Sequence, residues 1–325
     1  MRTPEFWYPA QGKSAGCLPL LLVPLALCYT ALGRLRTLFA RRWKAPVPIL
    51  SIGNLVAGGV GKTPMALALA SRLLDKGVKV HFLTRGYRGN HAGPLRVEPG
   101  LHTAAETGDE ALLLAAVAPT WVARNRKAGA MAAIAAGAEV LILDDGHQNP
   151  HLVKDLSLLL IDAERGHGNG WIIPSGPLRE APARGLARAD MVVMIGAGTF
   201  APPPAKPYLR ATRTLRDPYC MKGRRLLAFC GIGAPQQFFD MLLRGGAELT
   251  GTRAFPDHHP FTDNEIGKIL SLAAETDSAP VTTEKDWLRL PAARRRHVEP
   301  IGMEMRFTDE PALMRLLDAL TPRRP

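Results

Sequence analysis

A glycine-rich turn between an apolar run and a helix-like segment constrains this chain more than any other feature. Residues 53–64 read Gly-Asn-Leu-Val-Ala-Gly-Gly-Val-Gly-Lys-Thr-Pro, directly after the apolar run 47–52. Glycines let backbone N–H groups turn toward an anion and approach it closely. Lys62 can then reach the β- and γ-phosphates of a nucleotide, and the Thr63 hydroxyl can hold Mg²⁺. The pattern predicts a loop that cradles a nucleoside triphosphate with Gly58, Gly59, Val60, Gly61, Lys62 and Thr63.

The loop is a variant of the strict G-x-x-x-x-G-K-[ST] pattern. Val56 stands where the strict pattern has its first glycine, and the glycines fall at 58, 59 and 61 instead. A glycine-rich turn before an ordinary helix is the alternative. We favour the phosphate loop because an apolar strand, Gly-Lys-Thr and the amphipathic segment 65–74 occur in that order.

Length and charge set the broad class. The chain has 325 residues, enough for two domains, and its 46% hydrophobic content fits a folded protein. The net charge of +12 is spread over several clusters, which suits an anionic partner or serves solubility. The four cysteines have no CxxC spacing, so we expect reduced thiols. The basic clusters are 34–44, 85–88, 124–127, 179–188, 210–225 and 294–296.

An uncharged segment near the N-terminus predicts contact with a membrane. Residues 14–33 carry no charge; aromatic residues 6–8 precede them, and five basic residues lie within 34–44. The length would just span a bilayer, but Pro19 and Pro24 favour a broken, shallow segment. The basic residues follow the apolar run, which argues against a cleaved signal peptide. We favour an interfacial anchor on an anionic membrane surface; a true span and an apolar helix packed on the protein are the alternatives.

The order of apolar runs predicts an α/β fold. Continuous apolar strands that alternate with helices indicate a P-loop NTPase-like core with a mostly parallel sheet covered on both faces. Its ligand should lie beyond the carboxyl ends of the strands. The expected strands are 47–52, 78–83, 120–123, 140–143, 156–161 and 191–195, and the expected helices are 65–74, 111–117 and 128–136.

A proline-rich segment at 201–207 indicates a domain junction. We expect a membrane-associating segment over 1–45, the P-loop core over 46–200 and a smaller C-terminal α/β domain over 201–325. The last of these should carry strands 208–215, 226–230, 254–255 and 279–283, and helices 235–243, 263–274 and 310–320.

Two acidic pairs lie at predicted ligand-facing positions. Asp144 and Asp145 end the apolar strand 140–143, where P-loop enzymes keep a carboxylate for Mg²⁺. A turn or helix cap would use the same residues, and we favour the metal because of the loop upstream. Asp109 and Glu110 follow Gly108 at a helix start. Helix capping and a chemical role are equally compatible with that position.

Two motifs lie in the second half of the chain. Asp257-His258-His259-Pro260 could be a metal pair, a structural turn or an acid–base dyad, and no third metal ligand is evident. Residues 282–286 read Thr-Thr-Glu-Lys-Asp. The Lys-x-Asp spacing of guanine-reading loops is absent there, which favours ATP over GTP.

The motifs together resemble those of the tetraacyldisaccharide 4′-kinases, the lipid A 4′-kinases of Gram-negative bacteria. The resemblance runs from about residue 5 to 320, and it depends on the collinear order rather than on any single motif. Its motifs are residues 51–64, Thr84-Arg-Gly-Tyr87, Gly108-Asp-Glu110, Asp144-Asp-Gly146 with Gln148, Pro174-Ser-Gly-Pro-Leu-Arg-Glu180, Asp257-His-His259 and Thr282-Thr-Glu-Lys-Asp286.

The resemblance implies transfer of the ATP γ-phosphate to the 4′-hydroxyl of a tetraacylated glucosamine disaccharide 1-phosphate. It implies that a C-terminal domain closes over the site, and that the enzyme works at the cytoplasmic face of the inner membrane; we expect a monomer. Asp109 matches the family's general base, assisted by a histidine, with His258 favoured over His259. Lys62 and Thr63 match the phosphate and Mg²⁺ contacts, with Asp144 and Asp145 at the metal. Further polar positions near the phosphates or metal match Glu110, Arg126, Gln148 and Glu180.

Two positions depart from the family's pattern. Val56 stands where Thr or Ser is more common, and His147 replaces the commoner Phe before Gln148. Neither removes a reacting group, but both can alter how the loops pack.

Two other classes of protein share part of the pattern. A membrane-positioned P-loop switch ATPase also carries Gly-Gly-x-Gly-Lys-Thr, but it usually has Lys before the glycine pair, where this chain has Ala57. The hypothesis of a nucleic-acid-binding ATPase is supported only by the positive net charge. No helix-turn-helix, RNP or aromatic-interleaved basic stripe supports it, so we expect no nucleic-acid partner.

Overall fold

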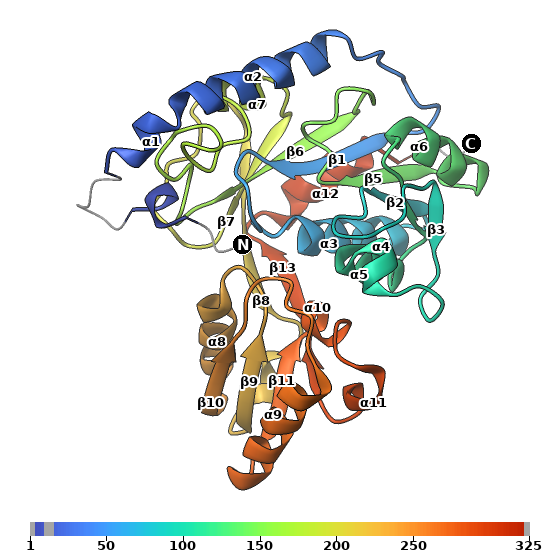
Figure 1. Cartoon of the computed structure of the whole chain (residues 1–325). Helices are drawn as coiled ribbons and strands as arrows, with labels where there is room; N and C mark the ends of the chain where they lie inside the picture. Colours follow the sequence, from blue (N-terminus) through green and yellow to red (C-terminus); the bar gives the residue numbers. More distant parts are fainter. Residues whose placement is uncertain (1–3, 10–15, 322–325) are drawn as a thin grey trace.

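The computed structural model describes residues 4–9 and 16–321. Parts of the expected terminal domains, residues 1–3, 10–15 and 322–325, lie outside the described residues. Figure 1 shows a larger lobe, which carries the N-terminal helices, and a smaller lobe below it. Strands β8 and β13 run from the larger lobe toward the smaller one.

The larger lobe is built on a nine-stranded sheet of order β13-β8-β7-β6-β1-β5-β2-β4-β3. Its inner strands pair in parallel, and only the edge strands β3 and β13 pair antiparallel with their neighbours. The predicted α/β fold with a mostly parallel sheet is thereby confirmed. The strands are β1 (Ile49–Asn54), β2 (Val80–Thr84), β3 (Leu95–Val97), β4 (Thr120–Val122), β5 (Val140–Asp144), β6 (Leu156–Asp162), β7 (Met191–Ile195), β8 (Tyr208–Leu215) and β13 (Met303–Phe307).

Helices cover both faces because the central strands are apolar on both sides. Leu50, Ile52 and Ile142 pack in one core cluster with residues of α3, α5 and α12. Ile49 and Leu141 face the opposite way and pack with α6. The helices of this lobe are α3 (Lys62–Asp75), α4 (Ala104–Thr107), α5 (Asp109–Ala115), α6 (Arg126–Ala135), α7 (Pro182–Ala187) and α12 (Glu310–Asp318).

The smaller lobe has a parallel four-stranded sheet of order β10-β9-β11-β12. Two core clusters flank it, one including α8 and the other α9. Its elements are η2 (Pro218–Met221), β9 (Arg225–Cys230), α8 (Pro235–Arg244), β10 (Glu248–Ala254), α9 (Asp263–Glu275), β11 (Ala279–Thr283), α10 (Glu284–Trp287), α11 (Ala292–Arg295) and β12 (Glu299–Ile301).

The change of sheet does not fall at the proline-rich segment 201–207. Strand β8, which follows that segment, still belongs to the nine-stranded sheet, and β13 returns to it from the smaller lobe. Helix α12 then packs Leu313 and Leu317 into the core of the larger lobe. Residues between β8 and β13 therefore form an insertion, so two strands connect the lobes rather than one linker.

The N-terminal helices lie along the outer edge of the larger lobe, on the side away from the smaller lobe (Figure 1). A short η1 (Glu5–Trp7) precedes α1 (Leu18–Leu21) and α2 (Val23–Leu38). Ala26 is the only buried residue of α2, and Leu21, Leu32 and Leu38 are each about 70% exposed or more. Within the described ranges, none of the helices is both long enough and apolar enough to cross a bilayer.

Candidate active site

The glycine-rich loop follows β1 and ends at the first residue of α3. Gly58 and Gly61 have φ values of +111° and +97°, a region that L side chains rarely adopt. Gly61 precedes Lys62 as the N-cap of α3, so the first N–H groups of this helix face the loop. Val56 is buried and pairs with Leu178, which gives this departure from the pattern a packing role. The loop has the form of an anion site at a helix N-terminus.

Lys62 lies between the loop and the carboxyl end of β5. Its Nζ is 3.3 Å from Asn54 Oδ1 and 3.7 Å from Asp145 Oδ1. Arg179 donates to both oxygens of Asp145, at 2.8 and 3.0 Å. Two cations and one carboxylate therefore gather beside the loop, where the phosphates of a nucleotide would enter.

Asp144 is the carboxylate that best fits Mg²⁺. Its Oδ2 accepts a hydrogen bond of 2.9 Å from Thr63 Oγ1, while its Oδ1 is buried without a hydrogen-bond partner among the described residues. Burial and the neighbouring Glu110 raise the pKa of Asp144 to about 7, despite the opposing charge of Lys62. An unpartnered buried carboxylate oxygen beside a threonine hydroxyl is an oxygen donor set suited to a hard cation.

The side chains of residues 4–9 and 16–321 do not by themselves form a complete metal cage. Among the described residues, no three His, Cys, Asp or Glu side chains converge as a metal site. Mg²⁺ is commonly held by one or two carboxylates together with phosphate oxygens and waters. The donor set at Thr63 and Asp144 matches that mode, whereas Asp145 is engaged by Arg179 and Lys62.

Asp109 and His258 meet across the two lobes. Asp109 is buried at the start of α5, and His258 lies in the loop between β10 and α9. His258 Nδ1 donates to Asp109 Oδ2 over 2.9 Å, and Asp109 Oδ1 accepts the Glu110 backbone N–H. Burial would raise the pKa of Asp109. The hydrogen bond from His258 and the charges of Lys285 and Arg289 outweigh it and lower this pKa to about 2.

Lys285 and Arg289 bring positive charge from the smaller lobe to this pair. Lys285 Nζ lies 3.3 Å from Glu110 Oε1, 3.4 Å from His258 Nε2 and 3.8 Å from Asp109 Oδ2. Because an ammonium group cannot accept a hydrogen bond, His258 Nε2 must be the acceptor and Nδ1 must carry the proton. Burial lowers the pKa of Lys285, but Glu110 and Asp109 raise it more, so this lysine stays protonated.

Arg289 is held inside the same group. Its Nε lies 3.6 Å from Asp109 Oδ2, and its Nη2 donates to the Gly231 carbonyl and to buried Asp286. Nε and Nη1 are buried without a hydrogen-bond partner among the described residues. The guanidinium therefore acts on Asp109 through charge rather than through a hydrogen bond.

The remaining sequence-predicted polar residues lie on the larger lobe. Arg126 is buried, and burial lowers its pKa to about 10, although Asp145 and Asp144 oppose the shift. Gln148 Nε2 donates to the Asn54 carbonyl at 2.8 Å and to Glu180 Oε1 at 3.2 Å. Glu180 also accepts from Arg188 at 2.6 Å. These contacts place Gln148 and Glu180 in one network with the strand that precedes the loop.

Two histidines of the sequence motifs have packing roles. His259 Nε2 contacts Glu265 Oε1 at 2.9 Å, and its ring stacks on Phe255, so it points away from Asp109. His147 is buried, with its ring nitrogens 3.1 Å from Ser157 Oγ and 3.0 Å from the Gly185 carbonyl. Burial and nearby Arg188 lower the pKa of His147 to about 4, so it is neutral at pH 7.

Sequence reasoning named no role for Lys285, Arg289 or Arg179. The motif Thr282–Asp286 begins at the end of strand β11, in the smaller lobe. Only the contact between the two lobes shows that Lys285 lies near Asp109. Arg179 directly precedes Glu180 in the motif 174–180. Its position next to a predicted site residue was the only sequence signal that could have indicated a role for Arg179.

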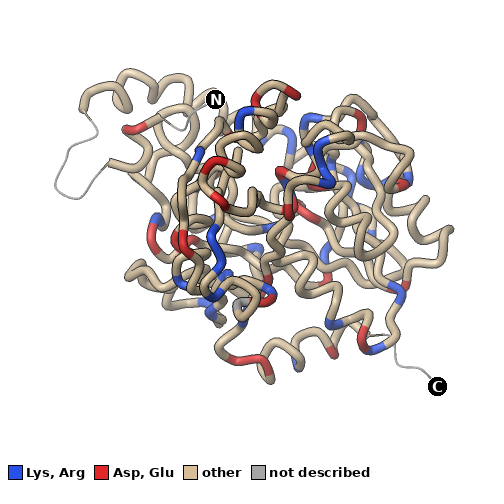
Figure 2. Tube along the Cα trace, turned by 90° about the horizontal axis from the view of Figure 1, so that it is seen from below, with Lys and Arg blue, Asp and Glu red and all other residues tan. Residues whose placement is uncertain are grey.

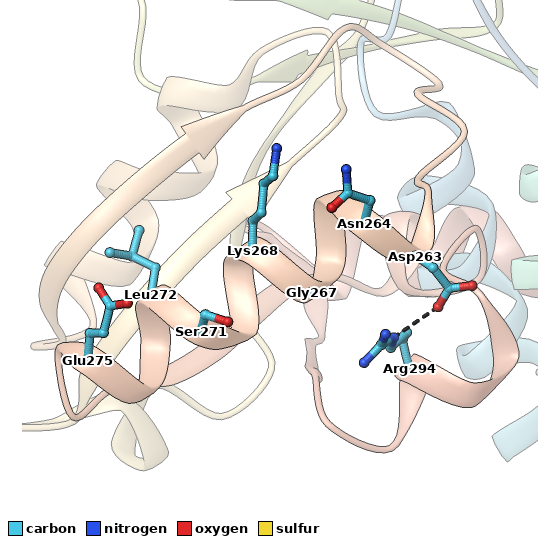
Figure 3. A pocket seen from close by; sticks show the side chains of 8 residues that line it. All are labelled: Asp263, Asn264, Gly267, Lys268, Ser271, Leu272, Glu275 and Arg294. Carbon is cyan, nitrogen blue, oxygen red and sulfur yellow. Dashed lines mark hydrogen bonds and ion pairs between the residues drawn. The ribbon is translucent and has the colours of Figure 1, made fainter.

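Neither the general surface charge nor the surface groove on α9 marks the site. Figure 2 shows basic and acidic residues interspersed over the molecule. The groove on α9 is open and lies between the ion-paired Asp263 and Arg294 at one end and Glu275 at the other (Figure 3). None of the residues that line it belongs to the groups described above.

Comparison with known proteins gives consistent matches over nearly the whole chain. Residues 18–321 match the family model described as tetraacyldisaccharide-1-P 4′-kinase. The tetraacyldisaccharide 4′-kinase of Rhodospirillum centenum is 50% identical over 327 residues, covering 98% of this chain and 97% of that protein. That of Gluconacetobacter diazotrophicus is 47% identical over 323 residues, covering 98% of each. The crystal structure of the "apo" form of LpxK from Aquifex aeolicus in complex with ATP superposes with a TM-score of 0.73 at 27% identity, over 94% of this chain and 100% of that one.

Proposed function

The chain belongs to the tetraacyldisaccharide 4′-kinase family, and from that premise we propose which of its residues carry the phosphoryl transfer. As a member, it is an ATP-dependent kinase that phosphorylates the 4′-hydroxyl of a tetraacylated glucosamine disaccharide 1-phosphate in lipid A biosynthesis. The observation that supports the division of roles is the meeting of Asp109 and His258, next to Glu110, whose charge acts on Asp144 at the end of β5.

In our proposal, the loop and Lys62 bind the transferring phosphate. The N–H groups of residues 58–63 and the Lys62 ammonium place positive charge where negative charge develops during transfer. Thr63 and Asp144 would hold Mg²⁺, with Asp145 alongside, because Asp144 Oδ1 is buried and unpartnered among the described residues. When bound, Mg²⁺ supplies charge neutralisation between the phosphates. Arg126, Gln148 and Glu180 are proposed to fix the loops around these groups.

Asp109 is proposed as the general base for the sugar hydroxyl. Its low pKa keeps it ionised at neutral pH, so it orients the 4′-hydroxyl and accepts the proton late, when the oxygen–phosphorus bond has largely formed. His258 holds the carboxylate in place through Nδ1–H. Lys285 donates a hydrogen bond to His258 Nε2 and forms an ion pair with Glu110. Closure of the two lobes therefore brings the base, the histidine and the lysine together.

We also propose that α1 and α2 lie in the surface of the membrane. Their leucines are exposed along the outer edge of the larger lobe, and Arg34, Arg36, Arg41 and Arg42 follow. Apolar side chains beside a basic flank suit the interface of an anionic membrane. In a Gram-negative cell, ATP restricts the reaction to the cytoplasmic face of the inner membrane. We further propose that the enzyme acts as a monomer.

Transfer of label from γ-labelled ATP tests the function. The expected product is a detergent-dispersed tetraacyldisaccharide 1-phosphate with label at the 4′-oxygen, formed faster than free phosphate. Free phosphate without labelled lipid would instead indicate a P-loop switch ATPase. Asp109→Asn separates the two results further, since it should slow transfer to lipid by about 10²-fold or more without preventing ATP from binding the loop.

A further inference from the structure

The β6–α7 loop, residues 163–181, pairs with the first residues of the phosphate loop. The Pro177 carbonyl accepts the Ala57 N–H at 2.7 Å. The Leu55 carbonyl accepts the Arg179 N–H, also at 2.7 Å. These are the bonds of an antiparallel strand pair, so the two segments hold each other by their backbones. The position of the phosphate loop therefore depends on where the β6–α7 loop lies.

Asn169 holds another part of the β6–α7 loop together through its side-chain amide. Its Nδ2 donates to the Ser175 carbonyl and to the Phe6 carbonyl, each at 3.0 Å. Its Oδ1 accepts the Trp171 N–H at 3.1 Å. The amide thus uses two donors and one acceptor at once, and a carboxylate, which only accepts, cannot reproduce this set. The fit is close, because a side chain at Gly176 would overlap Asn169 Oδ1.

The N-terminal segment that precedes α1 packs on the same loop. The Trp7 carbonyl accepts the Asn169 backbone N–H at 2.8 Å. Trp7 Nε1 donates to the Pro174 carbonyl at 3.1 Å. The Arg165 guanidinium lies 5.7 Å from the centre of the Tyr8 ring. Backbone and side-chain contacts therefore connect the N-terminal segment, through Asn169, with the loop that pairs with the phosphate loop.

We propose that Asn169 is a positioning residue for ATP binding. Together with the N-terminal segment, it keeps the β6–α7 loop in place, and this loop keeps the phosphate loop in the conformation that binds the nucleotide. The inference rests on the proposed function, which assigns ATP to the phosphate loop.

The proposal separates binding from chemistry. Without the amide of Asn169, more conformations are open to the β6–α7 loop, and ATP binds only the fraction of molecules that hold it in place. The apparent Kd for ATP rises by the inverse of that fraction. The rate of transfer from bound ATP stays the same, because the groups that act on the phosphate are unchanged.

Asn169→Ala should raise the Kd of a non-hydrolysable ATP analogue with Mg²⁺ about 10-fold, since three hydrogen bonds of the amide are lost. Calorimetry measures this Kd without acceptor lipid. At saturating ATP, kcat for the lipid should stay within about 2-fold of the wild type. Asn169→Asp should behave like Asn169→Ala, because a carboxylate cannot donate to the two carbonyls. Asn264→Ala, at an exposed asparagine of α9, is the matched control and should change neither value.

Hydrogen exchange separates this role from a general loss of stability. In Asn169→Ala, the backbone amides of Ala57 and Arg179 should exchange about 10-fold faster, whereas those of the inner strand β5 should keep the wild-type rate. Trp7→Phe removes the hydrogen bond to the Pro174 carbonyl and keeps an aromatic ring. It should change the Kd and the exchange in the same direction by about 3-fold, and it decides the question if Asn169→Ala does not fold.

An unchanged Kd with faster exchange in β5 as well would overturn the proposal, because Asn169 would then stabilise only the fold. A 10-fold loss of kcat at an unchanged Kd would also overturn it. If the wild type transferred no label to lipid, the kinase proposal would fall. The Kd of the analogue would still decide the role of Asn169, because that measurement needs no acceptor.

Discussion

His258 of the smaller lobe donates a hydrogen bond of 2.9 Å from Nδ1 to Oδ2 of Asp109 in the larger lobe. The contact joins residues 149 positions apart, and it forms because the insertion between β8 and β13 packs against α5 of the larger lobe. The base and the group that orients it therefore belong to different lobes. Any motion that separates the lobes must also separate this pair.

Replacement of Asp109 by Asn should lower kcat by about 10²-fold or more, because the amide cannot accept the proton of the acceptor hydroxyl. Replacement of Lys62 by Ala should lower it further, since that change removes charge from the transferring phosphate. His258→Gln should give a smaller loss. The control is His259→Gln, whose ring contacts Glu265 and Phe255. Near-normal turnover of Asp109→Asn in a lipid-labelling assay would rule out the base assignment.

Lys285→Met should lower kcat about 10-fold, because it removes the donor to His258 Nε2 and the partner of Glu110. Lys285→Arg should restore part of the activity, since the charge returns with altered geometry. Lys222→Met serves as control: this lysine is exposed on the same lobe. Steady-state kinetics with both substrates varied would check the prediction. A rise in KM for ATP with unchanged kcat would contradict a role beside the base.

Asp144→Asn and Thr63→Val should each raise the Mg²⁺ concentration needed for half-maximal activity by about 10-fold or more. The reason is that both remove an oxygen from the donor set at the end of β5. Asp190→Asn, a carboxylate remote from the phosphate loop, is the comparison. Titration of Mg²⁺ at fixed ATP is the measurement. An unchanged Mg²⁺ requirement in Asp144→Asn would move the metal to another ligand.

His147 should make stability depend on pH. Its pKa is about 4 in the folded chain and 6.5 in the unfolded chain, so the unfolded state binds the extra proton between these values. The stabilisation is complete above pH 6.5 and is lost as the pH falls toward 4, by at most about 3 kcal/mol. His147→Phe removes this dependence. The free energy of unfolding, measured by urea titration, should be lower at pH 5 than at pH 7.5 in the wild type. The difference between the two pH values should be smaller in His147→Phe.

The double change Leu25→Asp and Leu32→Asp should weaken binding to phosphatidylglycerol vesicles by at least about 10-fold, because it puts charge on the exposed face of α2. Leu243→Asp, at an exposed leucine of α8, should have little effect. Flotation with vesicles at two salt concentrations provides the measurement. If the double variant floated like the wild type, the membrane contact would lie elsewhere.

The sequence predicted the larger lobe well because its signals are local. Strand β5 is a continuous apolar run that ends in Asp144, and the glycine loop ends where Lys62 begins α3, so their positions follow from chain order and parallel pairing. The short strand β3 and the strands β12 and β13 were not predicted. β3 and β12 have only three residues each, and β13 mixes polar with apolar side chains.

The sequence also left the choice between helix cap and chemical group open at Asp109, because a carboxylate at a helix start suits either role. The domain boundary expected at residue 201 likewise marked a proline-rich turn rather than the change of sheet.

What the sequence alone determined was the phosphate loop, the α/β class and the family, since each rests on residue types in a fixed order along one segment. Only the tertiary structure decided that His258 rather than His259 faces Asp109, that Lys285 and Arg289 join them, and that Arg179 pairs with Asp145. The physical reason is that burial and charge pairing between distant segments depend on how the lobes pack. No local pattern of residues records that packing.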